Sequence, residues 1–312
     1  MSVLITGGTG FIGTALARLL LTNDNGPVVL FDLFPNQANV SDLAGEVTIV
    51  RGDFAEATEV ARVLRDHAVT DVFHLGYLTG EAEAYPARAI HTNCSGTNAV
   101  FECSMAAGVR RVMWPSSAAV HGATVTSPEP DWLTEDDPVA PDSLYGACKL
   151  FNEHVAERHH ARRGFDHAAL RLSSIAGPGR GDRRGIPPDL YATILERSAK
   201  GQPVTAPPAD HVLSWGYVKD AARAFHLLYE ADQLTRRIYN FAGESITVGD
   251  VAGLVRSMCP GAQIEHSDDA TRHLAYVDAR RLSTELGFES AFSAADAITD
   301  HLERIGRKDE QP

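Results

Sequence analysis

The chain contains few cysteines and fewer basic than acidic residues, and each of these features excludes a class of function. Only four cysteines occur in 312 residues, and none forms a CxxC pair or a Cys/His spacing suited to a metal. We therefore expect reduced cysteines, no metal site and a cytoplasmic location. The net charge is -13, from 28 basic and 41 acidic residues, which argues against a nucleic-acid or anionic-membrane surface.

Long apolar runs are also missing, since none approaches the roughly 18 residues of a membrane-spanning helix. The first apolar stretch, "SVLIT", runs straight into a glycine turn, which is typical of a strand rather than a signal peptide. A hydrophobic content of 44% and a charged content of 22% fit an ordinary globular protein. The length allows one large domain or two lobes.

Short apolar runs alternate with longer amphipathic ones over the first two-thirds of the chain. The runs that we interpret as strands are "SVLIT", "PVVLF", "VTIVR", "DVFHL", "RRVMWP" and "HAALRL". Helical patterns occupy residues 11–22, 56–66, 86–107 and 144–162. Continuous apolar strands alternating with helices predict a doubly wound parallel sheet covered on both faces, the Rossmann type of α/β fold.

This rhythm breaks after Leu172, where "SSIAGPGRGDRRGIPP" has the composition of a loop rather than a core strand. Helices are expected at 189–200, 219–231, 248–258 and 293–305, and short strands near 237–241 and 262–266. We expect the acidic stretch 129–142 to be a solvated loop. The predicted division gives a sheet domain of residues 1–172 plus 210–242, and a smaller mixed α/β lobe of residues 173–209 plus 243–312.

A glycine-rich turn, "LITGGTGFIG", follows the first strand and opens the first helix. Taken alone, Gly7, Gly10 and Gly13 could form an ordinary tight turn. A strand–turn–helix context instead lets the backbone approach a pyrophosphate at the helix N-terminus. Asp32 ends the second strand, where an acid holds the adenosine ribose. Its carboxylate would repel the extra phosphate of NADP, so we predict NAD.

A tyrosine and a lysine lie four positions apart in "PDSLYGACKL", as Tyr145 and Lys149. This spacing places them on one face of a helix. Alone, such a pair is more often an exposed helix pair than a catalytic one. With the glycine turn and Asp32 in the expected order, we favour the catalytic interpretation.

The GxxGxxG spacing together with "YGACK" resembles the extended short-chain dehydrogenase/reductases, the NAD-dependent epimerase/dehydratase type. The resemblance implies that Tyr145 is the general acid/base and that Lys149 lowers its pKa and holds the nicotinamide ribose. It also implies that Ser117, in "PSSAAVHG", orients the reacting oxygen. The sheet domain then binds NAD and the lobe binds substrate.

The same resemblance implies the cofactor contacts, with "RGDF" (51–54) at the adenine, "FHLG" (73–76) along the cofactor and an asparagine in the fourth helix. The implied cofactor-binding residues are Gly7, Gly10, Phe11, Ile12, Gly13, Asp32, Leu33, Asp53, Phe54, Leu75, Gly76, Asn93, Pro115, Ser116, Tyr145 and Lys149. Extended members also imply a homodimer formed by helices 86–107 and 144–162.

The sequence departs from the family's nucleotide-sugar enzymes at the substrate. Ser174 stands at the position of an asparagine, and Leu213 at that of an arginine that pairs with a diphosphate. Ala118 and Ala119 replace the Asp–Glu pair of dehydratases. These departures disfavour a nucleotide-sugar substrate and a dehydration.

A second resemblance, to the extended-type L-threonine 3-dehydrogenases, rests on "MWPSSAAVHG", "LYEAD", "YNFAGESIT" and "ELGFESAFSAADAITDHL". Thr79 falls at a substrate-contacting serine of those enzymes. Pro187 and Pro188, however, replace hydroxyl-bearing residues, which disfavours L-threonine itself. A related hydroxy acid, amino alcohol or sugar acid fits equally.

The loop "GPGRGDRRG" could be a lid that captures an anion, through Arg184 above all, or simply a solvated loop. Trp215, near the same cleft, is more often a packing residue. The candidate substrate residues are Thr79, Ser117, His121, Tyr145, Ser174, Arg184 and Trp215.

These patterns predict an NAD-dependent oxidoreductase that oxidises a secondary alcohol of a small polar, anionic substrate, a hydroxy or amino acid or a sugar acid. The alternative is an NAD-dependent sugar or nucleotide-sugar epimerase that retains and returns the hydride. A non-catalytic NAD sensor is disfavoured, because Tyr145, Lys149 and Ser117 are all present.

Overall fold

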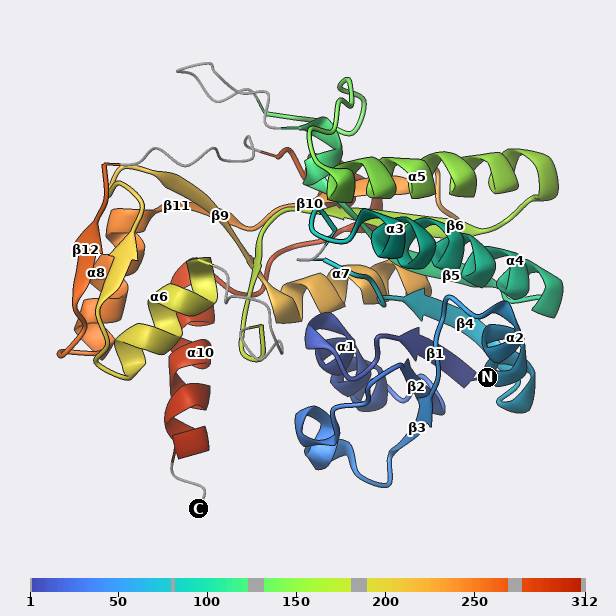
Figure 1. Ribbon diagram of the computed structural model, residues 1–312, viewed down its shortest axis with the longest axis horizontal. Helices are drawn as coiled ribbons and strands as arrows, with labels where there is room; N and C mark the ends of the chain where they lie inside the picture. The colour runs from blue at the N-terminus through green and yellow to red at the C-terminus, as the bar shows by residue number, and fades with distance from the viewer. Residues whose placement is uncertain (1, 80–81, 123–131, 181–189, 269–276, 310–312) are drawn as a thin grey trace.

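The computed structural model describes residues 2–79, 82–122, 132–180, 190–268 and 277–309 (Figure 1). Its centre is a seven-stranded parallel sheet with the strand order β10-β6-β5-β4-β1-β2-β3. The strands are β1 Ser2–Thr6, β2 Val28–Asp32, β3 Val47–Arg51, β4 Val69–His74, β5 Arg111–Ser117, β6 His167–Leu172 and β10 Ile238–Phe241. The order reverses between β1 and β4, and ligands bind at such a switch point. The predicted fold class is confirmed.

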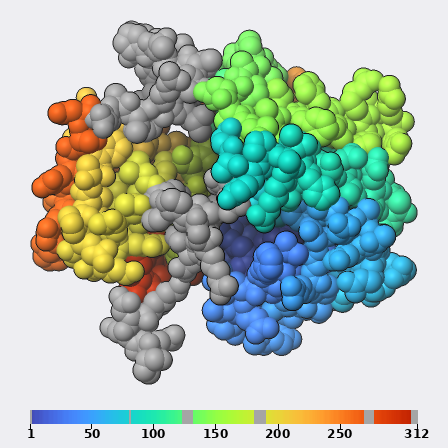
Figure 2. Space-filling view, in the orientation of Figure 1, coloured from blue at the N-terminus to red at the C-terminus, as the bar shows by residue number. Residues whose placement is uncertain are grey.

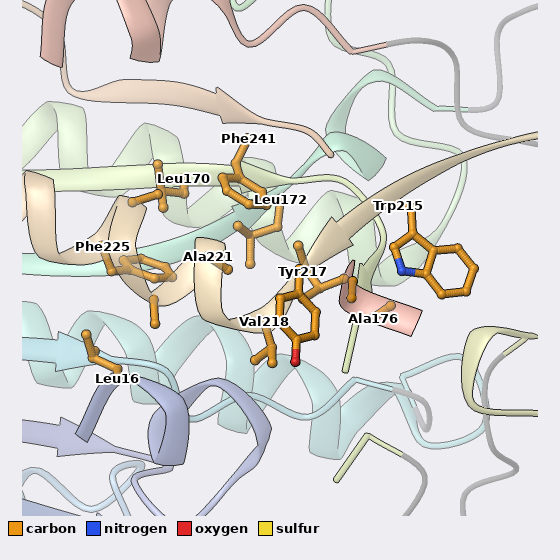
Figure 3. Close-up of a cluster of buried hydrophobic side chains, with 14 of the residues drawn as sticks. Leu16, Leu170, Leu172, Ala176, Trp215, Tyr217, Val218, Ala221, Phe225 and Phe241 are labelled. Atoms are coloured by element: carbon orange, nitrogen blue, oxygen red, sulfur yellow. The ribbon is translucent and has the colours of Figure 1, made fainter. Parts of the chain in front are cut away.

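Helices cover both faces of this sheet, as Figure 1 shows. On one face lie α1 (Phe11–Thr22) and α7 (Val218–Glu230); on the other lie α2 (Ala57–Asp66), α4 (Thr97–Ala107) and α5 (Leu144–Arg163). Alternate residues of each strand therefore pack into two different hydrophobic cores, one on each face of the sheet, because successive side chains of a strand point to opposite faces. Figure 3 shows part of the core against α1 and α7, in which Leu16, Leu170 and Phe225 meet.

The segment 86–107, expected as one helix, changes its geometry along its length. It starts as α3 (Pro86–Ala89), continues as a π-helix (η2, Ile90–Gly96) and ends as α4. A π-turn shifts the backbone hydrogen bonds by one residue and is frequent at functional sites. Two 3-10 helices, η1 (Gln37–Leu43) and η3 (Ala118–His121), complete the sheet domain.

The C-terminal elements form two small sheets and their helices beside the main sheet, in yellow to red in Figures 1 and 2. The sheets have the orders β11-β9-β7 and β12-β8. The elements are β7 Ile175–Ala176, α6 Leu190–Ala199, β8 Val204–Ala206, β9 Val212–Tyr217, β11 Glu244–Thr247, α8 Val248–Met258, β12 Ile264–His266, α9 Arg280–Leu286 and α10 Ala294–Asp309. The division into two lobes stays a prediction. Within the described ranges, no helix is both long and apolar enough to cross a membrane.

One expectation for a loop was wrong. Ile175 and Ala176, inside the expected loop, are buried and pair with Gly216 and Tyr217 of β9. The acidic stretch, over its described residues 132–142, is an irregular segment of exposed and half-buried residues, as expected, and Glu135 anchors it to the sheet. The Glu135 carboxylate accepts a hydrogen bond of 2.7 Å from the backbone N–H of Asn240. Because β10 is an edge strand of the sheet, this N–H needs a partner from outside the sheet.

Candidate active site

The glycine turn joins β1 to α1 and comes close to the end of β4. Gly7 has φ +63°, and a Cβ there would lie 2.8 Å from the Cα of Gly76. A Cβ on Gly13 would lie 2.5 Å from the carbonyl oxygen of Gly7. Gly10 is the N-cap of α1, and among the described side chains none caps the backbone of this first turn. The exposed N–H groups of such a turn suit a phosphate.

Asp32 ends β2 beside this turn, as the sequence predicted. Its carboxylate accepts hydrogen bonds from the Thr9 hydroxyl (2.7 Å) and from the backbone N–H of Phe34 (3.2 Å). The neighbouring Leu33 is partly exposed. The turn and the acid are therefore already joined, in the arrangement that an adenosine ribose and a pyrophosphate require.

The ends of β3 and β4 meet next to the turn. Asp53 accepts a hydrogen bond of 2.8 Å from the backbone of Ala55. The Phe54 ring packs edge-on against His74, with 4.9 Å between ring centroids. Leu75 and Gly76 bond to Thr6 of β1 through their backbone N–H groups, at 3.1 Å each. All the predicted cofactor residues from β1 to β4 thus lie along the carboxyl edge of the sheet.

Tyr145 lies in the first turn of α5, which is placed by two close contacts. The Ser143 hydroxyl caps the helix by accepting from the backbone N–H of Gly146 at 3.1 Å. A Cβ on Gly146 would lie only 2.5 Å from the carbonyl oxygen of Ala119. Glycine at this position therefore lets α5 approach η3, which follows Ser117 directly.

Lys149 is buried beneath Tyr145 on the same helix. Its Nζ donates to the carbonyl oxygen of Pro115 at 2.6 Å. The same Nζ lies 3.3 Å from the centroid of the Tyr77 ring and 5.6 Å from that of Tyr145. Burial lowers the pKa of Lys149 to about 7. No motif in the sequence pointed to Tyr77. It directly follows "HLG", however, and a small residue is usual at this position in the family that the sequence resembles.

Asn93 lies in the π-helix and is buried. Its side-chain amide makes two hydrogen bonds to the backbone of Leu78, at 2.8 and 2.9 Å. Its own carbonyl oxygen accepts from the Asn152 side chain at 2.9 Å. Asn93 therefore connects the segment after β4 to α5, and Asn152 is a positioning residue that the sequence did not indicate.

Behind the Tyr145–Lys149 pair lies a buried polar network. The Ser116 hydroxyl donates to Glu153 at 2.5 Å, and Arg171 of β6 forms two hydrogen bonds with the same carboxylate, at 2.9 and 2.8 Å. His121 lies 3.2 Å from the Pro138 carbonyl and 3.3 Å from Arg171. Burial lowers the pKa of His121, so its neutral ring can donate to Pro138 and accept from Arg171. Glu153, four residues after Lys149, was readable from helical spacing; Arg171 was not.

The candidate substrate residues are more scattered. Ser117 is the N-cap of η3, and its hydroxyl accepts from Ala119 at 3.1 Å. Thr79 is half-buried near the end of the first described range. Ser174 bonds through its carbonyl oxygen to Gly216. Trp215 is buried (Figure 3). Its ring centroid lies 4.6 Å from that of Tyr191.

The arginine-rich loop is described only up to Arg180. Its guanidinium lies 5.5 Å from the centroid of the Phe11 ring, at the start of α1. Arg184, Pro187 and Pro188 lie outside the described residues.

A cavity of about 860 Å³ lies away from this cluster, beyond β10. It is lined by residues such as Trp132, Glu244, Arg280 and Phe288, none of which contributes to the Tyr145–Lys149 arrangement. The groups suited to acid/base chemistry lie instead at the carboxyl edge of the sheet. Within the described ranges, no three His, Cys, Asp or Glu side chains gather as metal ligands, and all four cysteines are free.

A sequence profile of the NAD-dependent epimerase/dehydratase family matches residues 3–242. The chain belongs to this family. The predicted resemblance, the enzymatic nature and the NAD cofactor are thereby confirmed. The glycine turn that a Cβ would obstruct and the Asp32 carboxylate beside it are the features that fit this cofactor.

Relatives in the family have different activities. The chain is 27% identical to a dTDP-glucose 4,6-dehydratase of Streptomyces niveus, over 97% of this chain and 92% of the relative. It is 31% identical to a UDP-glucose 4-epimerase of Bacillus subtilis, over 63% of this chain and 60% of the relative.

Two solved structures share the fold over nearly the whole chain. A UDP-glucose 4-epimerase of Thermotoga maritima superposes with a TM-score of 0.87 at 23% identity, covering 100% of both chains. A partial consensus L-threonine 3-dehydrogenase superposes with a TM-score of 0.85 at 25% identity, covering 98% of this chain and 100% of the other.

Proposed function

We propose that this family member is an NAD-dependent dehydrogenase that oxidises a secondary alcohol of a small polar, anionic substrate, a hydroxy or amino acid or a sugar acid. The observation that carries the proposal is the arrangement of Tyr145 over a buried Lys149 at the carboxyl edge of the sheet, beside the glycine turn and Asp32.

In this proposal Tyr145 removes the proton of the substrate hydroxyl. The nearby Lys149 ammonium favours the phenolate, because an opposite charge stabilises it. Ser117 holds the reacting oxygen by a hydrogen bond. Bound NAD would supply the hydride acceptor. Gly7, Gly10 and Gly13 leave room for its pyrophosphate, and Asp32 selects its unphosphorylated ribose.

The proposal that the substrate is small rests on the position at which the nucleotide-sugar enzymes of the family carry an arginine that pairs with a diphosphate. Leu213 stands there and is buried, so that no guanidinium from this position can form the charge-assisted contact that a diphosphate needs. Ser174 is shorter than the usual asparagine and already bonds through its backbone to Gly216.

An epimerase that retains and returns the hydride is the second candidate. It is favoured by the likeness to the Bacillus subtilis UDP-glucose 4-epimerase, 31% identical over 63% of this chain. Dehydration is disfavoured despite the Streptomyces niveus relative, because Ala118 and Ala119 carry no acid or base.

We further propose a homodimer through helices 86–107 and 144–162, and the cytoplasm as its location. Ile90 of the first segment and Phe151 of α5 are exposed apolar side chains, which a second copy could cover.

The test mixes the purified chain with NAD and three substrate pools, and follows NADH absorbance. The pools contain small hydroxy and amino acids including L-threonine, free sugars and uronates, and nucleotide sugars. Tyr145→Phe runs beside the wild type, and Tyr85→Phe, which removes an exposed phenol elsewhere, serves as the matched control.

NADH formed from either of the first two pools, lost in Tyr145→Phe and kept in Tyr85→Phe, would support the dehydrogenase. Silence in all three pools would reject it. Epimerised product, detected by proton NMR with catalytic NAD, would then establish the second candidate.

A further inference from the structure

Tyr77 lies in the catalytic cluster although no sequence motif placed it there. It follows β4, and its ring packs edge-on against Tyr145 with 5.7 Å between centroids and an angle of 87°. The Lys149 Nζ lies 3.3 Å from its ring centroid. This is well inside the distance of about 6 Å at which an aromatic face attracts a cation.

The other groups around Lys149 leave its charge poorly compensated. The ionisable groups near it are His74 from β4 and Tyr145, Cys148 and Glu153 from α5, and Cys94 of the π-helix lies beside Cys148. His74 is neutral, because burial lowers its pKa to about 3. Burial raises the pKa of the Cys94 thiol to about 12, so it carries no charge either.

Glu153 is the remaining carboxylate, and it is already engaged. Its two oxygens bond to Arg171 at 2.9 and 2.8 Å, and one of them also accepts from Ser116. The Lys149 ammonium itself has three N–H donors, of which one meets the Pro115 carbonyl. The electron-rich face of Tyr77 is thus the group that lies directly on the ammonium.

We propose that Tyr77 is a positioning residue whose ring holds Lys149 in its charged form and so sets the pH range in which Tyr145 can act. This deepens the proposed function, because it assumes that the Tyr145–Lys149 pair is the acid/base. The ring, rather than the phenol hydroxyl, is responsible. That hydroxyl is buried and has no hydrogen-bond partner within the described residues.

The test measures the ionisation of Lys149 directly and needs no substrate. The chain contains only four lysines, Lys149, Lys200, Lys219 and Lys308. In protein labelled with 13C-lysine, the Cε resonance of Lys149 can therefore be assigned by its loss in Lys149→Arg. Its chemical shift is followed from mildly acidic to alkaline pH in the wild type, Tyr77→Leu and Tyr77→Phe, because the wild-type midpoint is expected at about 7.

Tyr77→Leu keeps an apolar side chain but removes the aromatic face, and we expect the Lys149 midpoint to fall by about one pH unit. Tyr77→Phe keeps the face and should leave the midpoint unchanged. Equal midpoints in all three proteins would overturn the proposal, and so would a shift in Tyr77→Phe as large as that in Tyr77→Leu. If circular dichroism shows that Tyr77→Leu is unfolded, Tyr77→Met provides the second aliphatic variant.

A second readout follows the reaction once a substrate is known. A neutral Lys149 no longer favours the Tyr145 phenolate, so the acidic limb of the pH profile of kcat/KM should move to higher pH in Tyr77→Leu and stay in place in Tyr77→Phe. A purely structural role would lower activity without moving this limb. The NMR titration does not depend on the proposed reaction. If the Lys149 midpoint shifts in Tyr77→Leu but no pool yields NADH, the dehydrogenase is rejected and the role of Tyr77 is retained.

Discussion

At the scale of single residues, the main feature of the site is the amino group of Lys149, which is buried away from water. Lys149 is only 2% exposed, and its contacts are a carbonyl oxygen and two aromatic rings. Such a site lowers the stability of the fold, because burial disfavours the charged form of lysine.

We expect Lys149→Met to stabilise the protein while abolishing activity. The folded-state pKa of Lys149 is about 7, below the ordinary 10.5. Below pH 7 both states carry the proton, and the folded state bears the whole cost of the buried charge. Methionine removes this cost, and we expect the free energy of unfolding to rise by about 2 kcal/mol there.

This gain should shrink as the pH rises above 7, because the folded wild type then loses its proton while the unfolded chain keeps it up to about 10.5. Urea unfolding at several pH values measures the difference. A less stable Lys149→Met protein below pH 7 would show that the Pro115 and Tyr77 contacts outweigh desolvation.

At the scale of elements, the strands and α5 are locked together by the network of Ser116, Glu153 and Arg171. These residues come from β5, α5 and β6. The side chains of Glu153 and Arg171 are only 4% and 6% exposed, so water cannot replace a lost partner. The network therefore fixes α5, with Tyr145 and Lys149 on it, against the end of β5.

We expect Arg171→Met to lower the free energy of unfolding by about 3–5 kcal/mol, because it leaves the Glu153 charge buried without its partner. Adding Glu153→Leu should recover at least half of this loss. Chemical denaturation of both variants measures the effect. Arg65→Met, which breaks the exposed pair with Asp66, is the control and should change stability by less than about 1 kcal/mol. No recovery in the double variant would mean that the lost packing of Arg171, rather than the unpaired charge of Glu153, accounts for the loss of stability.

At the scale of the whole molecule, the outer surface of α3, η2 and α5 carries exposed apolar side chains. Ile90 is 48% exposed and Phe151 is 47% exposed. Figure 1 places α4 and α5 side by side at the edge of the molecule, and the two helix segments could form a four-helix bundle with a second copy.

We expect Phe151→Glu to weaken this proposed dimer by at least tenfold, because a carboxylate in an apolar contact loses its hydration. Analytical ultracentrifugation over a range of concentrations measures the dissociation. Phe34→Glu changes a phenylalanine that is 70% exposed elsewhere and should leave the oligomeric state unchanged. A wild type that stays monomeric, or a Phe151→Glu protein that dimerises normally, would contradict the predicted interface.

The sequence by itself determined what depends on neighbours along the chain. Strand and helix periodicity predicted the main sheet and most helices, the glycine spacing predicted the β1–α1 turn, and the four-residue spacing placed Tyr145 and Lys149 on one helix face. These features follow from local geometry, in which residue order sets position directly.

Only the tertiary structure decided which distant segments meet. Strands β7 and β9 were not foreseen, because β7 has only two residues and β9 gains its stability from pairing with β7 and β11. Tyr77 reaches Lys149 from the end of β4, and Arg171 reaches Glu153 from β6. Such contacts depend on strand order and on burial, which no spacing along a single chain specifies. They nevertheless surround the residues that the sequence identified.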